Sequence, residues 1–119
     1  MIPISSDLMS AIDSPRQAVI KSAAEFDTLW RAHAPGRPAP AVDFARNIVL
    51  AVFLGSRPSS GFAVQITGAE RAGDALVVTW TERRPGPDQM AAQVMTAPAH
   101  MVAVPRFDGT VRFQKGGGD

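Results

Sequence analysis

Seven consecutive apolar residues, Ile48–Leu54, constrain the fold of this 119-residue chain more than any other feature. Asn47 and Gly55 bound the run, and a short apolar run between turn signals is typical of a strand buried on both faces. The run is much shorter than the ~20 residues that span a bilayer, so no membrane insertion is expected. The pattern predicts a central strand around which the rest of the chain builds its core.

Two later stretches alternate between apolar and polar side chains, which is the period of a strand with one wet face. Their apolar members are Phe62, Val64 and Ile66 in the first and Leu76, Val78 and Trp80 in the second. Gly73-Asp74 lies between the stretches and has the residue types of a tight hairpin turn. We therefore expect a hairpin whose inner face buries Trp80 with its apolar neighbours.

One segment, Ala23–Ala34, has helical spacing. Phe26, Leu29, Trp30 and His33 recur on one face, Ser22 is a suitable N-cap, and Glu25 stands where a capping box requires it. Pro35-Gly36 ends the segment. The sequence predicts a single helix packed on a sheet.

The other elements are shorter. Strands are predicted at Gln17–Lys21, Gln93–Met95, His100–Val104 and from Val111 to Phe113. Residues 1–16 mix Ser, Asp and Pro with scattered apolar residues and predict a flexible N-terminal arm, while 115–119 predict a disordered tail. Residues 17–114 then form one domain. The expected fold is mainly β (α+β): an antiparallel β-sandwich or open barrel with one packed helix near the N-terminus.

Composition excludes several classes of function. A formal net charge of +1 gives no electrostatic footprint for nucleic acid. The absence of Cys and the presence of only two His exclude thiolate or three-imidazole metal sites, and we expect neither metal nor cofactor. The N-terminus has no basic end followed by an apolar core, so no export signal is expected in these residues.

Ser56, Ser59 and Ser60, in the loop after Ile48–Leu54, are candidates for nucleophilic chemistry. The strained Gly-x-Ser-x-Gly turn that exposes a nucleophile is missing, and residues 55–61 lack the lysine of a phosphate-binding loop. We identify no catalytic residue. An alternative function, a small-ligand-binding or hydrolytic domain, would use Ser59 or Ser60 with His100.

Two loops rich in proline and glycine are the candidate partner-binding sites. Their residues are Arg57, Pro58, Ser59, Ser60, Gly61 and Phe62 in the first loop and Arg84, Pro85, Gly86 and Pro87 in the second. Proline reduces the freedom that a loop loses on docking, and arginine is enriched at interfaces. We expect Arg57 to contact the partner, so that its loss leaves stability nearly unchanged.

A long segment of the chain resembles a known family. The stretch from Val42 to Phe62, VDFARNIVLAVFLGSRPSSGF, is similar to the signature of the PrcB C-terminal domain family, named for a non-catalytic subunit of a bacterial surface protease complex. Pro85-Gly86-Pro87, Gln93, Thr96, Pro98 and Val102–Pro105 follow in the family's order. Family members often have Thr-Gly-Gly-Tyr at 59–62 and commonly carry an export or lipoprotein signal.

This resemblance implies a non-enzymatic interaction module that binds a protease or a protease complex, in the cell envelope or secreted; without it, a cytoplasmic location is the default. Residues 58–62 are also similar to one loop of chagasin-like inhibitors of cysteine proteases. Both likenesses imply a β scaffold that presents loops to a protease. The sequence gives no indication of the oligomeric state.

Overall fold

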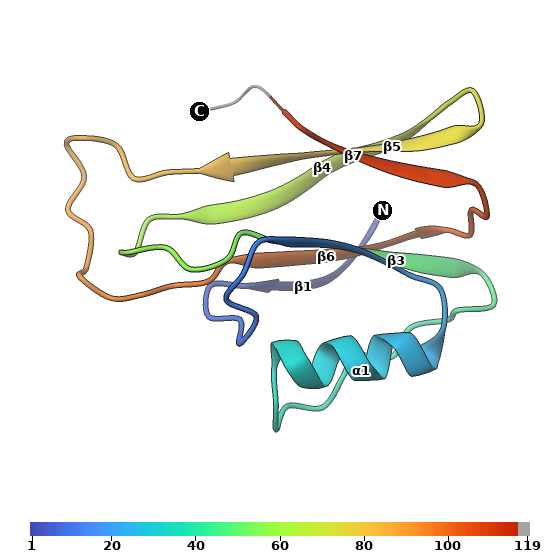
Figure 1. Cartoon of the computed structure of the whole chain (residues 1–119), viewed down its shortest axis with the longest axis horizontal. Helices are drawn as coiled ribbons and strands as arrows, with labels where there is room; N and C mark the ends of the chain where they lie inside the picture. The colour runs from blue at the N-terminus through green and yellow to red at the C-terminus, as the bar shows by residue number, and fades with distance from the viewer. Residues whose placement is uncertain (117–119) are drawn as a thin grey trace.

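Seven strands and one helix form within residues 1–116, the part of the chain that the computed structural model describes (Figure 1). The elements are β1 (Ile2–Asp7), β2 (Arg16–Ile20), α1 (Ala23–His33), β3 (Asn47–Phe53), β4 (Ala63–Ala72), β5 (Ala75–Arg83), β6 (Ala99–Pro105) and β7 (Thr110–Lys115). They stack in three layers, with α1 on a four-stranded sheet and a three-stranded sheet on the other side. None of the described helices is long and apolar enough to cross a membrane.

The sheets are open and mostly antiparallel. The larger sheet has the order β1-β6-β3-β2 with antiparallel neighbours throughout, and the smaller has the order β4-β5-β7. The predicted class, mainly β with one packed helix, is confirmed. One pair departs from it: β7 runs parallel to β5, because the chain crosses from the larger sheet back to the smaller one before β7.

Strand β3 lies between β2 and β6 and divides its side chains between two cores. Val49, Ala51 and Phe53 pack under α1. Ile48, Leu50 and Val52 pack against the smaller sheet. The prediction of a central strand buried on both faces is confirmed, and the unbroken apolar run follows from it because neither face of β3 meets water.

The helix begins and packs as its residues predict. The Ser22 hydroxyl accepts a hydrogen bond from the Glu25 N–H, and the Glu25 carboxylate accepts one from the Lys21 N–H, which completes the capping box. Phe26, Leu29, Trp30 and His33 are buried. The helix therefore packs on the outer face of the larger sheet through the one face that carries these buried side chains.

The N-terminal segment differs from the prediction of a flexible arm. Residues 2–7 form β1 and pair with β6 along its length, and Ser10 and Ile12 are buried. An edge strand is held mainly by backbone hydrogen bonds to its neighbour. Because several of its side chains are polar, their pattern did not indicate a strand. Of the predicted tail, Lys115 belongs to β7 and the Gly116 N–H bonds the Trp80 carbonyl; 117–119 lie outside the described residues.

Two smaller predictions are corrected. Gln93–Met95 is not a strand but an exposed crossing between β5 and β6, because its side chains face water and its backbone bonds loop residues. The Trp80 side chain is only partly buried. It packs against the core between the two sheets, and the Lys115 ammonium lies over its ring. The hairpin at Gly73 forms as predicted, with that glycine at a φ of 63°.

Candidate interaction surface

The two proline-bearing loops meet at one end of the molecule, on the left of Figure 1. Residues 54–62 join β3 to β4, and residues 84–98 join β5 to β6. We call these loops, together with Leu8 and Met9, the loop end. The sequence placed candidate residues in both loops, and the structure brings the loops into contact.

Backbone hydrogen bonds tie the loops together. Arg57 and Thr96 exchange two N–H to carbonyl bonds of 2.7 and 2.9 Å, and the Ser60 N–H donates to the Ala92 carbonyl at 3.1 Å. The Ser60 hydroxyl accepts from the Ala92 N–H at 2.7 Å, and the Thr96 hydroxyl donates to the Ser59 carbonyl at 3.0 Å. The loops are therefore ordered before any partner arrives.

Gly61, in the first loop, lies close to Pro85 of the second loop. Its φ is 94°, in the left-handed region, and a Cβ built on it would lie 2.7 Å from the Pro85 Cβ. Both the backbone conformation and the space require glycine here. The first loop can thus approach Pro85 of the second loop this closely only because residue 61 has no side chain.

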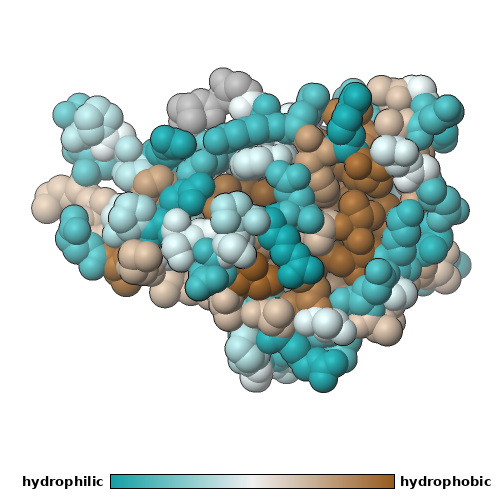
Figure 2. All heavy atoms as spheres, in the orientation of Figure 1, coloured by the Kyte–Doolittle hydropathy of each residue, from teal (hydrophilic) through white to brown (hydrophobic). Residues whose placement is uncertain are grey.

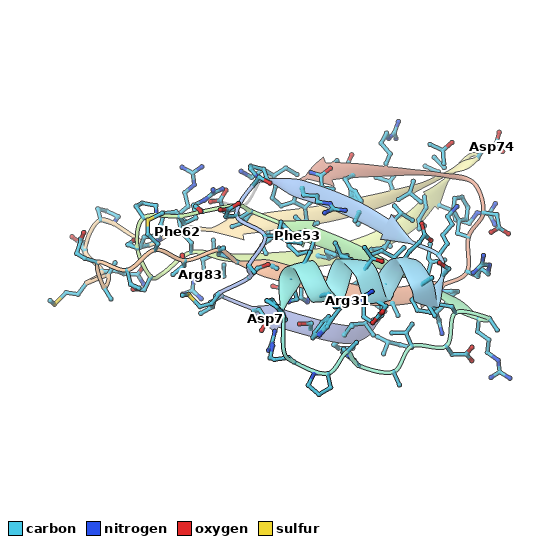
Figure 3. The ribbon with its side chains drawn as sticks, turned by 60° about the horizontal axis from the view of Figure 1, so that its bottom comes forward. Asp7, Arg31, Phe53, Phe62, Asp74 and Arg83 are labelled. Atoms are coloured by element: carbon cyan, nitrogen blue, oxygen red, sulfur yellow. The ribbon has the colours of Figure 1, made fainter. Side chains whose placement is uncertain are left out.

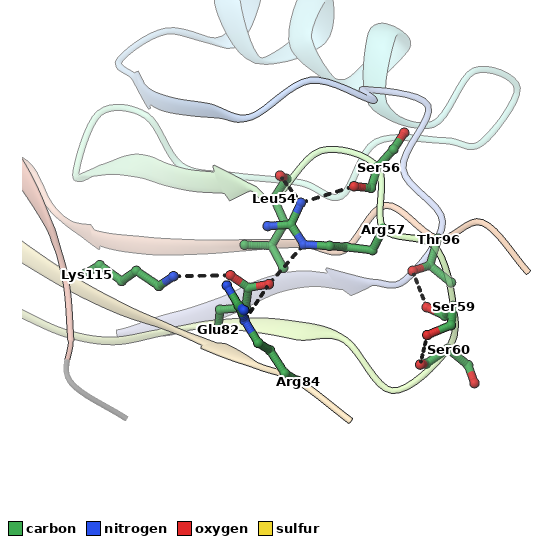
Figure 4. A network of polar contacts seen from close by, with 9 residues as sticks. All are labelled: Leu54, Ser56, Arg57, Ser59, Ser60, Glu82, Arg84, Thr96 and Lys115. Atoms are coloured by element: carbon green, nitrogen blue, oxygen red, sulfur yellow. Dashed lines mark hydrogen bonds and ion pairs between the residues drawn. The ribbon is translucent and has the colours of Figure 1, made fainter. Parts of the chain in front are cut away.

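A buried carboxylate holds the base of the loop end (Figure 4). The Glu82 side chain is 2% exposed and accepts from Arg57 Nε at 2.9 Å and Lys115 Nζ at 3.2 Å, with Arg84 Nε at 3.7 Å. Burial by itself raises the pKa of Glu82, but the hydrogen bonds from Arg57 and Lys115 and their charges outweigh burial and lower it. Glu82 is therefore an ionised anchor beneath both loops.

Arg57 is a structural residue of this anchor. Besides Glu82, its guanidinium donates to the carbonyls of Leu54 and Ser56, and it lies over the Phe62 ring. These contacts reverse the expectation that its loss would leave stability unchanged, because without Arg57 the buried Glu82 carboxylate would keep only Lys115 and the more distant Arg84 as partners. Arg84, with a side chain 63% exposed, is the freer of the two predicted arginines.

Large apolar side chains are exposed at the loop end. Leu8, Met9, Met90, Val94 and Met95 are exposed, and they are five of the seven exposed large apolar residues in the described chain. Leu8 and Met9 join the patch because the Ala97 N–H donates to the Leu8 carbonyl and Met9 pairs with Ala97. Figure 2 shows hydrophobic atoms among hydrophilic ones at this end.

Residues 48–105, from β3 to the end of β6, match the family model described as PrcB C-terminal. Over these residues the chain is similar to the PrcB C-terminal family. The predicted resemblance is confirmed, and the matched segment contains both proline-bearing loops. No curated protein and no solved structure matches the chain, so the likeness to chagasin-like inhibitors stays a similarity of five loop residues.

The alternative site with a loop serine and His100 is not assembled in the PrcB C-terminal segment. The Ser59 hydroxyl donates to the Ser60 carbonyl, and the Ser60 hydroxyl accepts from Ala92. His100, on β6, instead accepts at Nδ1 from the Ile66 N–H at 2.8 Å. The three side chains thus have separate structural partners.

A Ser–His–Asp chain does exist, outside the PrcB C-terminal segment and between residues that the sequence analysis did not combine. The Ser10 hydroxyl lies 2.7 Å from His33 Nδ1, and His33 Nε2 donates to the Asp7 carboxylate at 2.9 Å. Burial raises the pKa of Asp7, but hydrogen bonds from Ser5 and His33 and the Arg37 charge outweigh it and lower the pKa. No local sequence motif indicates this contact between the N-terminal segment and the end of α1.

The Ser10–His33–Asp7 network has a structural role. His33 is 1% exposed and Ser10 is 8% exposed, so a substrate cannot approach the hydroxyl. Ser10 Oγ also accepts from the Ile12 N–H, which holds it in place. Among residues 1–116, no group of three or more His, Asp or Glu side chains could hold a metal ion. The network fastens the N-terminal strand to the helix.

Proposed function

We propose that the chain is a non-enzymatic interaction module that serves as an accessory part of a protease complex and binds it through the loop end. The match of residues 48–105 to the PrcB C-terminal family model supports the protease association. The proposed contacts are the exposed apolar residues of the loop end, with Arg84 and the prolines of both loops around them.

The observation that carries the proposal is a group of exposed apolar side chains on loops that are already fixed by hydrogen bonds. Exposed apolar side chains gathered at one end of a folded surface are typical of interaction sites. Methionine contributes three of the five side chains, and its flexible thioether adapts to irregular partner surfaces. Because the loops are tied by hydrogen bonds to one another and to Glu82, docking loses little conformational entropy.

Affinity purification from the native organism, followed by mass spectrometry, tests this function. The wild-type protein is expected to retain a peptidase or a subunit bound to one. A variant with Met90→Ser and Met95→Ser should lose that partner, since it removes two exposed apolar contacts without touching the core. Ile2→Ser is the control, because Ile2 is 54% exposed, close to Met95 at 61%, but lies at the other end of β1 from Leu8 and Met9.

Two results would contradict the proposal. One is retention of the partner by the methionine variant with its loss in Ile2→Ser, which would place the interface elsewhere. The other is turnover of ester, peptide or phosphoester substrates by the purified protein that disappears in Ser10→Ala, Ser59→Ala or Ser60→Ala. Such turnover would favour the hydrolytic alternative.

A further inference from the structure

A groove of about 250 Å³ lies beside the loop end. It is lined by Ser6, Ala63, Val64, Gln65, Thr81, Arg83 and His100, which come from β1, β4, β5 and β6. Ala63 directly follows the first loop, and Arg83 directly precedes the second. Figure 3 shows Arg83 and Phe62 at this same end of the molecule. The groove is therefore continuous with the surface proposed for partner binding.

His100 presents a fixed hydrogen-bond donor to this groove. The Ile66 N–H donates to Nδ1 at 2.8 Å, so Nδ1 carries a lone pair and the proton of the neutral ring is on Nε2. Burial lowers the pKa of His100, which favours that neutral form. Nε2 has no partner in the described part of the chain and is not among its buried unpartnered atoms. It is thus open to a ligand.

Arg83 supplies the charge of the groove. It is exposed and forms no ion pair with any described residue, because the neighbouring Glu82 lies on the opposite face of β5 with Arg57, Arg84 and Lys115 around it. The groove is lined by no acidic residue. Asp7, next to Ser6, is already held by His33 and Arg37. The guanidinium therefore has no internal counterion.

The remaining polar groups of the groove are also able to donate. Ser6 and Thr81 have hydroxyls, Gln65 has an amide, and Ser6 lies directly opposite His100 in the β1–β6 register. Ala63 and Val64 add a small apolar wall. A cationic fork, a neutral N–H and several donors beside an apolar wall match a carboxylate on a short aliphatic stem.

We propose that this groove binds a carboxylate group, with Arg83 pairing with its charge and His100 Nε2–H donating to one of its oxygens. One guanidinium and one neutral imidazole suit a monoanion, whereas phosphate sites gather several charges or backbone N–H groups. Placing this carboxylate on the partner protein, as an acidic side chain or a chain terminus, rests on the proposed function. The groove then selects an acidic residue beside the apolar contact of the loop end.

Titration with small carboxylates, followed by proton–nitrogen NMR of the His100 ring and the Arg83 side chain, tests the inference directly. The probes are N-acetylglutamate amide for a side-chain carboxylate, N-acetylalanine for a chain terminus, and N-acetylglutamine amide as the neutral isostere. We expect saturable shifts with at least one carboxylate and none with the neutral probe. The better carboxylate identifies the source.

Three variants separate the groove from general charge effects. Arg83→Gln should weaken the carboxylate about tenfold, the value of one charge-assisted hydrogen bond, and Arg112→Gln, an equal charge change on β7, should leave it unaltered. His100→Asn keeps an acceptor for the Ile66 N–H but removes Nε2–H, and it should weaken binding as well. Thermal unfolding of each variant checks that the fold is retained.

The inference is overturned if neither carboxylate binds, if Arg112→Gln weakens binding as much as Arg83→Gln, or if inorganic phosphate binds more tightly than both carboxylates. These outcomes are independent of the proposed function. If a carboxylate binds but no peptidase is captured, the carboxylate site stands and the protease assignment is wrong. If a peptidase is captured but no carboxylate binds, the protease assignment stands and the carboxylate site is wrong.

Discussion

At the scale of single residues, the buried carboxylate of Glu82 determines how the loop end is held. Arg57→Ala should lower the free energy of unfolding by about 3 kcal/mol, at the lower end of the effect of breaking a buried ion pair because Lys115 remains. Arg84→Ala should cost under about 1 kcal/mol, since its guanidinium is exposed and lies farther from Glu82. Urea unfolding of both variants measures the difference, and equal losses would contradict the role given to Arg57.

The lowered pKa values of Glu82 and Asp7 make stability depend on acidity. Each carboxyl binds its proton less readily in the folded state than in the unfolded state, so its contribution is complete above the ordinary values of 4.5 and 3.8 and is lost as pH falls through the folded pKa. Urea unfolding between about pH 7 and pH 3 should show stability falling only in the acidic part. Glu82→Gln should reduce that slope, and an unchanged slope would contradict the assignment.

The residues that were predictable from sequence are those with local partners. Ser22 and Glu25 lie three positions apart, so their capping contact is encoded within one helical turn. The contact of Ser10 with His33 spans 23 positions and depends on where β1 pairs. The anchoring role of Arg57 was missed for the same reason, since Glu82 is 25 positions away.

At the scale of elements, the contact between the two loops depends on Gly61. Gly61→Ala should destabilise the fold by more than Gly73→Ala, because both glycines have a positive φ but only a Cβ at 61 would meet Pro85. The backbone strain common to both is about 1–2 kcal/mol, so the excess measures the loop contact. Thermal unfolding measures the additional destabilisation of Gly61→Ala over Gly73→Ala. NMR chemical shifts of residues 84–92 should change in Gly61→Ala. Equal losses would mean that the loops are not packed together.

Elements were predictable where a side-chain pattern reports burial. Strand β3 and the β4–β5 hairpin follow from apolar runs and alternation, because each has a face in the core. Strand β1 was missed, since it lies at a sheet edge and has no fully buried side chain. The parallel direction of β7 was also unpredictable, as the period of a strand carries no information about the direction of its neighbour.

At the scale of the whole molecule, the family segment is not a complete structural unit. Residues 48–105 hold most of β3 and all of β6, but the helix that covers their outer face and the edge strands β1 and β2 that flank them come earlier in the chain. That outer face includes Val49, Phe53 and Met101, all buried under α1. The sequence-based boundary at residue 17 likewise separates β1 from the sheet that it completes.

We therefore predict that residues 48–116 alone do not fold. Without α1 the fragment would expose an apolar sheet face, and it would also lose β1 and β2 from both edges of the larger sheet. Residues 1–116 should give dispersed NMR spectra and a cooperative thermal transition, whereas the fragment should give neither. A cooperatively folded fragment would mean that the smaller sheet with β3 and β6 is stable alone, and that the helix layer is an addition and not part of the core.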